Sequence, residues 1–280
     1  MKRGTTTLKE DGREGCVVRA KRNTFSDLEK TARRENAKGA YIVRGRHPRE
    51  NEIAEWLKEK EEEEFECGEI EVIGLNVAPS RNKCEDENCD DCDDGEHLAG
   101  PEEIREACKK LVEKLPASFR DAVRSDAEKI ATMSRRLCPN VPWLVLKLEI
   151  CQYLRCIKWH QDYYTSRTLV TYVGPGTCAA DDKDVRWNEI DVEGPNDGCV
   201  KNVKQMETNS VLLMKGNFWP GIRGKGLTHK SPASAKNPPP KRLILKVDLQ
   251  DDVILDPDDV EEEEEEGDQS PTKRRRVDDE

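Results

Sequence analysis

The feature of this chain that most limits its fold is a change of texture after Pro139. Four β-like apolar runs follow it, and clusters of glycine and proline separate them; the runs are residues 143–150, 168–173, 210–215 and 243–249. Runs of this length between Gly/Pro turns are typical of strands. Short strands divided by tight turns predict a β-barrel or a β-sandwich.

The residues before Pro139 favour helices instead. Pro101 begins the clearest pattern, in which the apolar positions 104, 108, 111 and 115 share one helix face. The acidic residues directly after Pro101 suit the positive end of a helix dipole. Other expected elements are helices over residues 50–62 and 118–137 and short strands over residues 39–44 and 70–78. The chain is therefore predicted to be an α+β protein, with N-terminal helices packed outside a β core.

Composition divides the chain further. Charged residues make up 38% of it and hydrophobic residues only 35%, which is too polar for every segment to be packed. We expect a basic, disordered leader (1–40), a mainly helical support region (41–139), a β domain that carries the site (140–250) and a disordered acidic tail with a basic cluster (251–280).

The net charge of −11 is concentrated in acidic runs at residues 61–64, 85–94 and 251–266. This charge argues against direct binding to nucleic acid or to anionic membranes. No stretch approaches the about 20 apolar residues that span a bilayer, and no apolar run follows Met1, so we expect neither a membrane span nor a secretory signal.

The cysteines and the basic cluster bear on the compartment. The eleven cysteines are scattered, which favours reduced thiols in the nucleus or cytoplasm over a secreted disulfide framework. The cluster of Lys273, Arg274, Arg275 and Arg276 is typical of a signal bound by a nuclear import receptor. The expected localisation is therefore nuclear or cytoplasmic.

Two of the four histidines stand in contexts that favour a metal site. His160 and Asp162 are two residues apart, so in a strand both side chains point to the same face. His229 lies 67 residues after Asp162, just before the last strand. Two histidines and one carboxylate form a facial triad, which leaves positions open on Fe(II) for a 2-oxoacid and dioxygen. The competing interpretation is that His160 is an ordinary core or surface histidine and that Asp162 belongs to a turn.

An arginine would complete such a site by holding the far carboxylate of 2-oxoglutarate in a bidentate pair. Arg242 lies thirteen residues past His229, at the start of the last strand. Strand alternation places the apolar residues of that strand on the face opposite Arg242, which would let Arg242 point to solvent. Arg167 is therefore the second candidate for this anion clamp.

Several stretches resemble a family known only as a domain of unknown function, found in bacteria and in eukaryotic microbes. They are WHQD at 159–162 with Arg167, TY at 171–172, GPGT at 174–177, LMKG at 213–216, WPG at 219–221, GKGLTHKSP at 224–232 and RLIL at 242–245. The order of these motifs is more distantly similar to Fe(II)/2-oxoglutarate oxygenases. This resemblance implies a double-stranded β-helix, a cupin-like jelly roll, with iron and 2-oxoglutarate as cofactors.

The same resemblance implies that His160, Asp162 and His229 hold iron and act in catalysis, and that Arg242 or Arg167 holds the cosubstrate. One position departs from the oxygenase pattern. Those enzymes usually carry Ser or Thr two residues after the arginine, where this chain has Ile244. That departure puts the role of Arg242 in doubt.

Cys156 offers a different metal. It lies four residues before His160, so an unbroken strand would place both on one face together with Asp162. A thiolate beside two histidines favours zinc over a redox-active iron centre. The alternative for Cys156 is a small buried hydrophobic residue.

A second cysteine-containing segment lies at residues 82–97. Cys84, Cys89, Cys92 and His97 have the ligand types and number of a tetrahedral zinc site. The alternative is a solvated acidic loop, because aspartates flank these residues throughout and no aromatic residue accompanies them.

The sequence thus supports two hypotheses of function. The first is an Fe(II)/2-oxoglutarate-dependent dioxygenase with an unknown substrate, in which Trp159, Tyr163 and Trp219 are either pocket walls or core. The second is a zinc-binding protein of metal homeostasis that uses the same His/Asp/His residues without catalysis. A third interpretation is an interaction domain that keeps the barrel without its chemistry.

Overall fold

The computed structural model describes residues 15–62, 68–78, 98–151, 156–190, 196–222, 225–233 and 241–251. The possible zinc ligands Cys84, Cys89, Cys92 and His97 lie outside the described residues. So do almost the whole acidic tail and its basic cluster. Among the described residues, no helix has the length and apolar character needed to cross a membrane.

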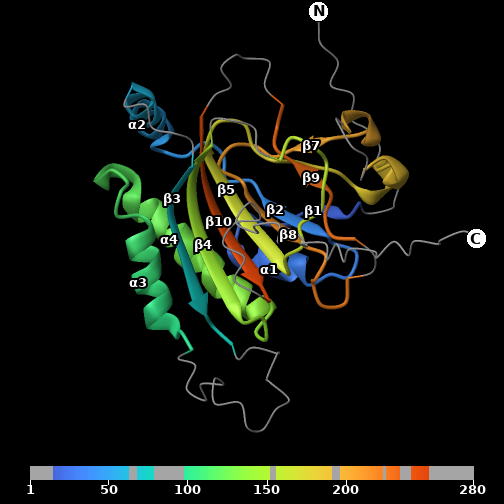
Figure 1. Cartoon of the computed structure of the whole chain (residues 1–280), viewed down its shortest axis with the longest axis horizontal. Helices are drawn as coiled ribbons and strands as arrows, with labels where there is room; N and C mark the ends of the chain where they lie inside the picture. Colours follow the sequence, from blue (N-terminus) through green and yellow to red (C-terminus); the bar gives the residue numbers. More distant parts are fainter. Residues whose placement is uncertain are drawn as a thin grey trace, which may run out of the picture.

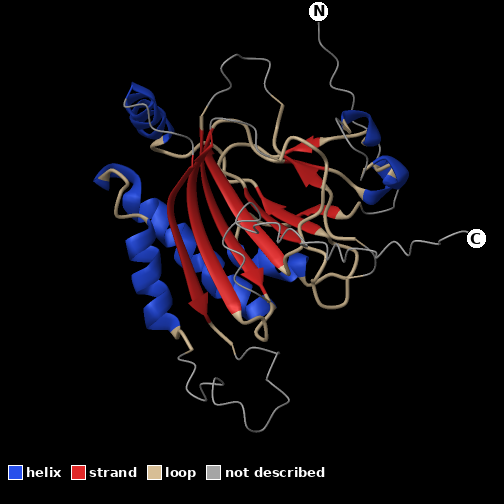
Figure 2. Ribbon diagram, in the orientation of Figure 1, coloured by secondary structure: helices blue, strands red, loops and turns tan. Residues whose placement is uncertain are grey.

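The described part of the chain is a mixed α+β structure with four α-helices and two sheets (Figures 1 and 2). In chain order the elements are β1 (Val17–Arg19), α1 (Phe25–Ala32), β2 (Gly39–Ile42), α2 (Glu50–Glu62), β3 (Gly68–Asn76), α3 (Pro101–Leu111), α4 (Ala117–Leu137), β4 (Trp143–Cys151), β5 (Ser166–Val173), β6 (Cys178–Ala179), η1 (Asp182–Asp184), η2 (Trp187–Glu189), η3 (Asp197–Cys199), β7 (Lys204–Gln205), β8 (Val211–Lys215), β9 (His229–Lys230) and β10 (Arg242–Gln250).

The larger sheet has seven strands in the order β1-β2-β8-β5-β10-β4-β3. Its pairs are antiparallel except for β1 and β2, which are parallel. The last strand, β10, is inserted between β4 and β5 and pairs with both along almost its whole length. A smaller sheet has the order β7-β6-β9, and it lies away from α3 and α4 (Figure 2).

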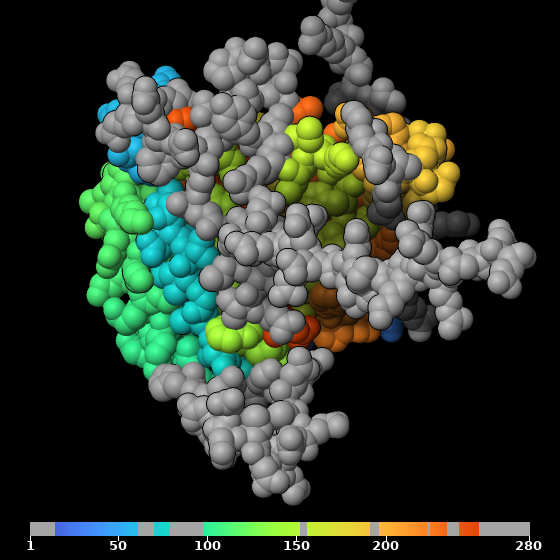
Figure 3. All heavy atoms as spheres, viewed as in Figure 1, coloured from blue at the N-terminus to red at the C-terminus, as the bar shows by residue number. Residues whose placement is uncertain are grey.

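The helices cover one face of the larger sheet. Strand alternation directs Leu243, Leu245, Val247 and Leu249 of β10 to this face, where they join the main hydrophobic core with α4. Every third or fourth residue of α4 is buried, as a helix packed along one side requires. The helix α3 lies beside the edge strand β3 (Figure 3).

The other face of the larger sheet divides into an apolar and a polar part. Strands β1, β5 and β8 pack apolar side chains against the smaller sheet in a second core that includes Leu169, Leu212, Met214 and Leu227. Strands β10 and β4 also carry charged side chains on this face. Arg242, Lys246 and Asp248 occupy alternating positions of β10, and Glu149 of the paired strand β4 lies on the same face. This polar part is where the candidate site lies.

The expected disordered leader is wrong for residues 15–40. This segment contains β1 and β2, which form one edge of the larger sheet, and α1, which packs Leu28 and Ala32 into the core. Thr24 caps α1 by accepting a hydrogen bond from the backbone N–H of Asp27. The segment is ordered because a few well-spaced apolar residues are enough when neighbouring strands complete their burial.

The predicted boundary at residue 140 does not separate two structural units. Strands β1, β2 and β3 all precede it, yet they pair within the same sheet as the strands that follow. The helices before the boundary also share one core with the strands after it.

Candidate metal centre

Three side chains with metal-binding atoms converge between the two sheets. One possible ligand atom from each of His160, Asp162 and His229 lies within 4.8 Å of the others. Among the described residues, this is the one cluster of three or more His, Cys, Asp or Glu side chains that could hold a metal ion. The two histidines are directly opposite each other in an antiparallel bridge. Each backbone N–H donates to the other's carbonyl at 3.0 Å, and the two ring centroids are 4.4 Å apart.

Backbone carbonyls set the orientation of both imidazole rings. Nδ1 of His160 lies 2.8 Å from the carbonyl oxygen of Lys158, and Nδ1 of His229 lies 3.0 Å from that of Leu227. A carbonyl can only accept, so each Nδ1 carries the proton and each Nε2 keeps a free lone pair. The Nε2 atoms face the Asp162 carboxylate at 3.8 and 3.5 Å. This is the arrangement that orients histidine ligands in metal sites.

The two carboxylate oxygens of Asp162 have different surroundings. Oδ1 accepts a hydrogen bond of 3.4 Å from Nη1 of Arg167. Oδ2 is buried and has no hydrogen-bond donor among the described residues, although Nη1 of Arg167 lies 3.2 Å away. Burial raises the pKa of Asp162, but the charges of Arg167 and the histidines outweigh it and lower this pKa to about 2. The group is therefore a carboxylate at neutral pH.

The two histidines differ in their electrostatics. Burial lowers the pKa of His229 to about 4, although the nearby Asp162 opposes this effect. Burial also lowers the pKa of His160, but the hydrogen bond to Cys156 and the charge of Asp162 outweigh it, so the net shift is upward. His229 is almost fully buried, while the His160 side chain is 30% exposed. The site is therefore reached from the His160 side.

These residues fit a divalent metal ion. The Nε2 atoms of both histidines and one buried carboxylate oxygen without a hydrogen-bond donor among the described residues all face the same small volume. Leaving such an oxygen without a partner is costly in a protein interior. A metal ion bound by these three atoms would remove that cost. Both histidines and Asp162 are thus brought together as the sequence predicts.

The segments that carry the ligands are tied together by residues that the sequence analysis assigned no role. The backbone N–H of Asn217 donates to the Asp162 carbonyl at 2.9 Å, and its side chain accepts from the N–H of Gly226 at 2.6 Å. The side chain of Gln161 donates to Thr228 Oγ1 at 2.8 Å inside the protein. These contacts hold the His160–Asp162 segment against the segment that leads to His229.

Gly216 shows how closely these segments approach. A Cβ atom at this position would lie 1.9 Å from the carbonyl oxygen of Tyr164. Only glycine allows the two chains to pass at this distance. Gly216 is the last residue of the LMKG motif, so the sequence marked this position but not the close approach of the two segments that requires glycine.

Arg242 is buried, and the expectation that it could point to solvent is wrong. It is 4% exposed, because the face of β10 opposite the helices is itself covered. Its guanidinium donates to the Pro175 carbonyl at 3.5 Å and to Ser231 Oγ at 3.3 Å. A Cβ at Gly174 would lie 2.7 Å from its Cγ, so the GPGT turn packs directly on this side chain.

Arg242 is also a cation without an acidic partner among the described residues. Burial lowers the pKa of its guanidinium, with Cys151 and Glu149 opposing that shift. Its hydrogen-bond partners are neutral: the Pro175 carbonyl, Ser231 Oγ and the Cys151 thiol. Ser231 is only two residues from His229, so Arg242 lies beside the segment that carries this histidine, with no carboxylate partner among the described residues.

Arg167 is not available as a free anion clamp. Its Nε and Nη2 donate to the two oxygens of Asp248 at 2.8 and 2.9 Å, and Asp248 is fully buried. The guanidinium also lies 4.7 Å from the centre of the Tyr164 ring. Its third acidic contact is with Asp162, so Arg167 supports this carboxylate of the candidate site.

Two charged residues behind the site escaped the sequence analysis. Asp248 holds Arg167, and Lys246 pairs with Glu149 at 2.6 Å. A signal for both was available. In the otherwise apolar run 243–249, the polar residues Lys246 and Asp248 alternate in phase with Arg242, which indicates a polar wall on one side of a buried strand.

Cys156 does not lie on an unbroken strand with His160. Its φ of 57° places it in a left-handed turn, and its carbonyl accepts from the N–H of Ser231 at 2.9 Å. The thiol still contacts the His160 ring, and this hydrogen bond lowers the thiol pKa. However, Cys156 is outside the group of mutually close ligand atoms, so the described residues do not assemble a zinc site with four protein ligands.

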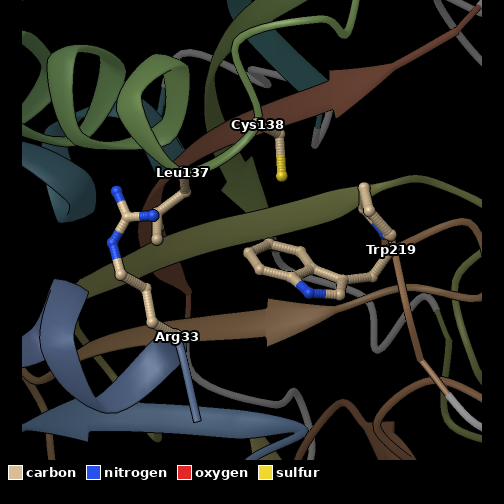
Figure 4. Close-up of a pocket in the computed structure, with 5 residues that line it drawn as sticks. Arg33, Leu137, Cys138 and Trp219 are labelled. Atoms are coloured by element: carbon tan, nitrogen blue, oxygen red, sulfur yellow. The ribbon is translucent and has the colours of Figure 1, made fainter. Parts of the chain in front are cut away.

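The three aromatic residues considered as pocket walls have separate environments. Trp159 is buried in a small core of its own. Tyr163 is 72% exposed and makes an edge contact with Phe218. Trp219 lines a pocket with Arg33, Leu137, Cys138 and Pro220 (Figure 4). No residue of the triad lines that pocket.

Comparison with known proteins gives a family but no activity. A family model described as "Protein of unknown function (DUF1826)" matches residues 83–248. No curated protein sequence matches the chain. Among solved structures, a rice dioxygenase for auxin oxidation is similar at 11% identity and a TM-score of 0.43, over 85% of this chain and 83% of that one. A Pseudomonas putida prolyl-4-hydroxylase is similar at 9% identity and a TM-score of 0.36, over 81% of this chain and 98% of that one. Likeness at this level carries no conclusion about activity.

Proposed function

The chain belongs to the DUF1826 family of proteins of unknown function, and from the site described above we propose that it is an Fe(II)/2-oxoglutarate-dependent dioxygenase. This proposal is carried by the convergence of the Nε2 atoms of His160 and His229 on the Asp162 carboxylate, whose Oδ2 is a buried oxygen without a hydrogen-bond donor among the described residues. The buried Arg242, which has no carboxylate partner among the described residues, lies beside the segment of His229. Three ligands of these types leave coordination positions open, as non-haem Fe(II) oxygenases require.

The architecture supports the same proposal. Two sheets face each other, and the candidate ligands project between them from β9 and from the segment before β5. We assign this core to the double-stranded β-helix class. In β-barrels and jelly rolls of this size, the space between the sheets can hold one small ligand.

Each residue of the chain would have a definite task. His160, Asp162 and His229 would hold Fe(II), and the bound iron would supply the activation of dioxygen that oxidises the substrate. Arg242 would bind the far carboxylate of 2-oxoglutarate through its planar guanidinium. The exposed edge of His160 would face the entering substrate, while burial of His229 and Arg242 would keep bulk water from the other side.

The zinc alternative has weaker support. A closed zinc site needs a fourth protein ligand, and the thiol of Cys156 hydrogen-bonds His160 but lies outside the ligand group. Among the described residues, the cluster has no other cysteine, histidine or acid within reach. An open site with three ligands is better matched to catalysis than to storage or structure.

Metal analysis tests the proposal directly. Protein purified without oxygen and without added metal should contain near-stoichiometric iron. The His160→Ala/His229→Ala double variant should lose it. The next assay is 2-oxoglutarate turnover, followed as succinate release. Zinc in place of iron in the wild-type protein would support the alternative, and retention of iron in the double variant would place the metal elsewhere.

A further inference from the structure

Thr171 carries a buried hydroxyl that has no hydrogen-bond partner among the described residues. Its side chain lies in β5 and is 2% exposed. Most buried hydroxyls in proteins are hydrogen-bonded, because a buried polar group without a partner loses its hydration for no return. The Thr171 hydroxyl is therefore a donor that a bound molecule can use.

Strand pairing places this hydroxyl on the face of the sheet that carries the candidate site. Thr171 lies directly opposite Ile244 of β10, and residues paired across two strands point to the same face. Arg242 is two residues before Ile244, so it shares this face. Leu169, two residues before Thr171, packs into the second core on the same side.

A β-bulge beside Thr171 fixes this orientation. The register of β5 and β10 shifts here, because Tyr172 is an extra residue in β5. Tyr172 turns to the helices, where its hydroxyl donates to Asp126 of α4 at 2.9 Å. The backbone N–H of Asn209 donates to the Thr171 carbonyl at 2.7 Å from the neighbouring side. Bulges beside functional sites often serve to direct a side chain in this way.

Thr171 and Arg242 complement each other as hydrogen-bond donors. Diagonal neighbours on adjacent antiparallel strands lie about 7–8 Å apart, and one carboxylate that is hydrogen-bonded on both sides can bridge such a separation. Arg242 is buried and has no carboxylate partner among the described residues. Ile244, which lies opposite Thr171 on this face, offers no side-chain donor. A carboxylate bound here would therefore receive a charged partner from β10 and a neutral donor from β5.

We propose that Thr171 donates to the same distal carboxylate as Arg242, and that the two residues together select 2-oxoacids that carry this second carboxylate. This inference rests on the proposed function, because it concerns the cosubstrate of that site. Arg242 supplies the charge. The Thr171 hydroxyl has a single proton to donate, so it engages one carboxylate oxygen and fixes the rotation of the group.

The experiment measures the affinity of the full chain loaded with Mn²⁺, by calorimetric titration without oxygen. The titrants are 2-oxoglutarate and 2-oxopentanoate, which has the same chain length but a methyl group in place of the distal carboxylate. The test variant is Thr171→Val, which replaces the hydroxyl by a methyl group. The matched control is Thr168→Val, the same change at another buried hydroxyl of β5 without a partner among the described residues. Thr168 lies opposite Val247, on the face that the helices cover.

Thr171→Val should weaken the binding of 2-oxoglutarate roughly 10- to 100-fold, because a hydrogen bond to a charged group is lost. The weaker binding of 2-oxopentanoate should not change. Thr168→Val should bind both oxoacids as the wild type does, and Thr171→Ser, which keeps the hydroxyl, should keep most of the affinity. Circular dichroism verifies that each variant is folded, and Thr171→Ala is measured instead if the valine variant is not.

Unchanged affinity for 2-oxoglutarate in Thr171→Val would overturn the role of Thr171 and leave the proposed activity standing. Equal losses for both oxoacids in this variant, or the same loss in Thr168→Val, would also overturn it, since the substitution would then act through the packing of β5. A wild-type protein that binds Mn²⁺ but neither oxoacid would refute the proposed activity and this inference together.

Discussion

Replacing Arg242 with methionine should make the ligand-free protein more stable while weakening its hold on 2-oxoglutarate. Arg242 is 4% exposed, and its hydrogen-bond partners are neutral: the Pro175 carbonyl at 3.5 Å, Ser231 Oγ at 3.3 Å and the Cys151 thiol. A guanidinium buried without a carboxylate has lost its hydration and gained little in return. Methionine fills similar space without charge, so the free energy of unfolding should rise by about 1 kcal/mol.

The same substitution should have the opposite effect on the cosubstrate. A carboxylate that pairs with Arg242 would supply the missing counter-charge through two charge-assisted hydrogen bonds. Truncating one partner of such a buried pair typically costs about 2–5 kcal/mol. The affinity for 2-oxoglutarate should therefore fall roughly 30- to 4,000-fold.

Both effects can be measured on one sample. Thermal and urea unfolding of metal-loaded protein gives the stability, and calorimetric titration with 2-oxoglutarate gives the affinity. Arg242→Lys is the matched control, because it keeps the charge but not the two-point geometry, and it should fall between the wild type and methionine. A methionine variant that is less stable and binds 2-oxoglutarate with unchanged affinity would refute the argument, since Arg242 would then be a structural residue.

Three further outcomes are expected. Gly216→Ala should destabilise the protein by about 2–4 kcal/mol in urea unfolding and weaken metal binding, because its Cβ would lie 1.9 Å from the Tyr164 carbonyl; an alanine variant with wild-type stability and metal affinity would contradict this. The folded-state pKa of His229 is lowered from 6.5 to about 4, so its contribution to stability is present above pH 6.5 and lost as the pH falls toward 4, an effect of about 3 kcal/mol. Urea unfolding of metal-free protein at pH 4 and above pH 6.5 should show that acid lowers the free energy of unfolding less in His229→Gln than in the wild type. The upward pKa shift of His160 acts in the opposite direction, but it is present in both proteins. Cys156→Ser should leave the iron content unchanged, because the thiol is outside the ligand cluster; a loss of iron would make Cys156 a ligand.

Much of the fold was predictable because its signals are local. The expected strands over residues 143–150, 168–173, 210–215 and 243–249 correspond to β4, β5, β8 and β10, and Pro101 begins α3 as its pattern predicts. Proline at a first turn and apolar residues at a fixed period act over a few residues. No partner from elsewhere in the chain is needed to recognise them.

The parts that escaped prediction depend on distant partners. The leader looked too polar to fold, but β1 pairs with β2, and β2 pairs with β8, whose residues lie more than 160 positions away. Arg242 looked exposed because the sequence does not reveal what covers the second face of β10. The candidate metal ligands were indicated by their spacing, whereas the Arg167–Asp248 pair joins residues 81 positions apart, and no local pattern links them.

The place of β10 at the centre of the larger sheet has a consequence for biosynthesis. It is the last strand among the described residues, yet it fills the gap between β4 and β5. While a ribosome is making the chain, β4 and β5 have therefore been translated but lack the neighbour that joins them. The nascent protein exposes two unpaired strand edges rich in apolar residues, which is a state prone to aggregation and attractive to chaperones. Assembly of the site must wait until β10 has left the ribosome, because Arg242 and Asp248 arrive with it.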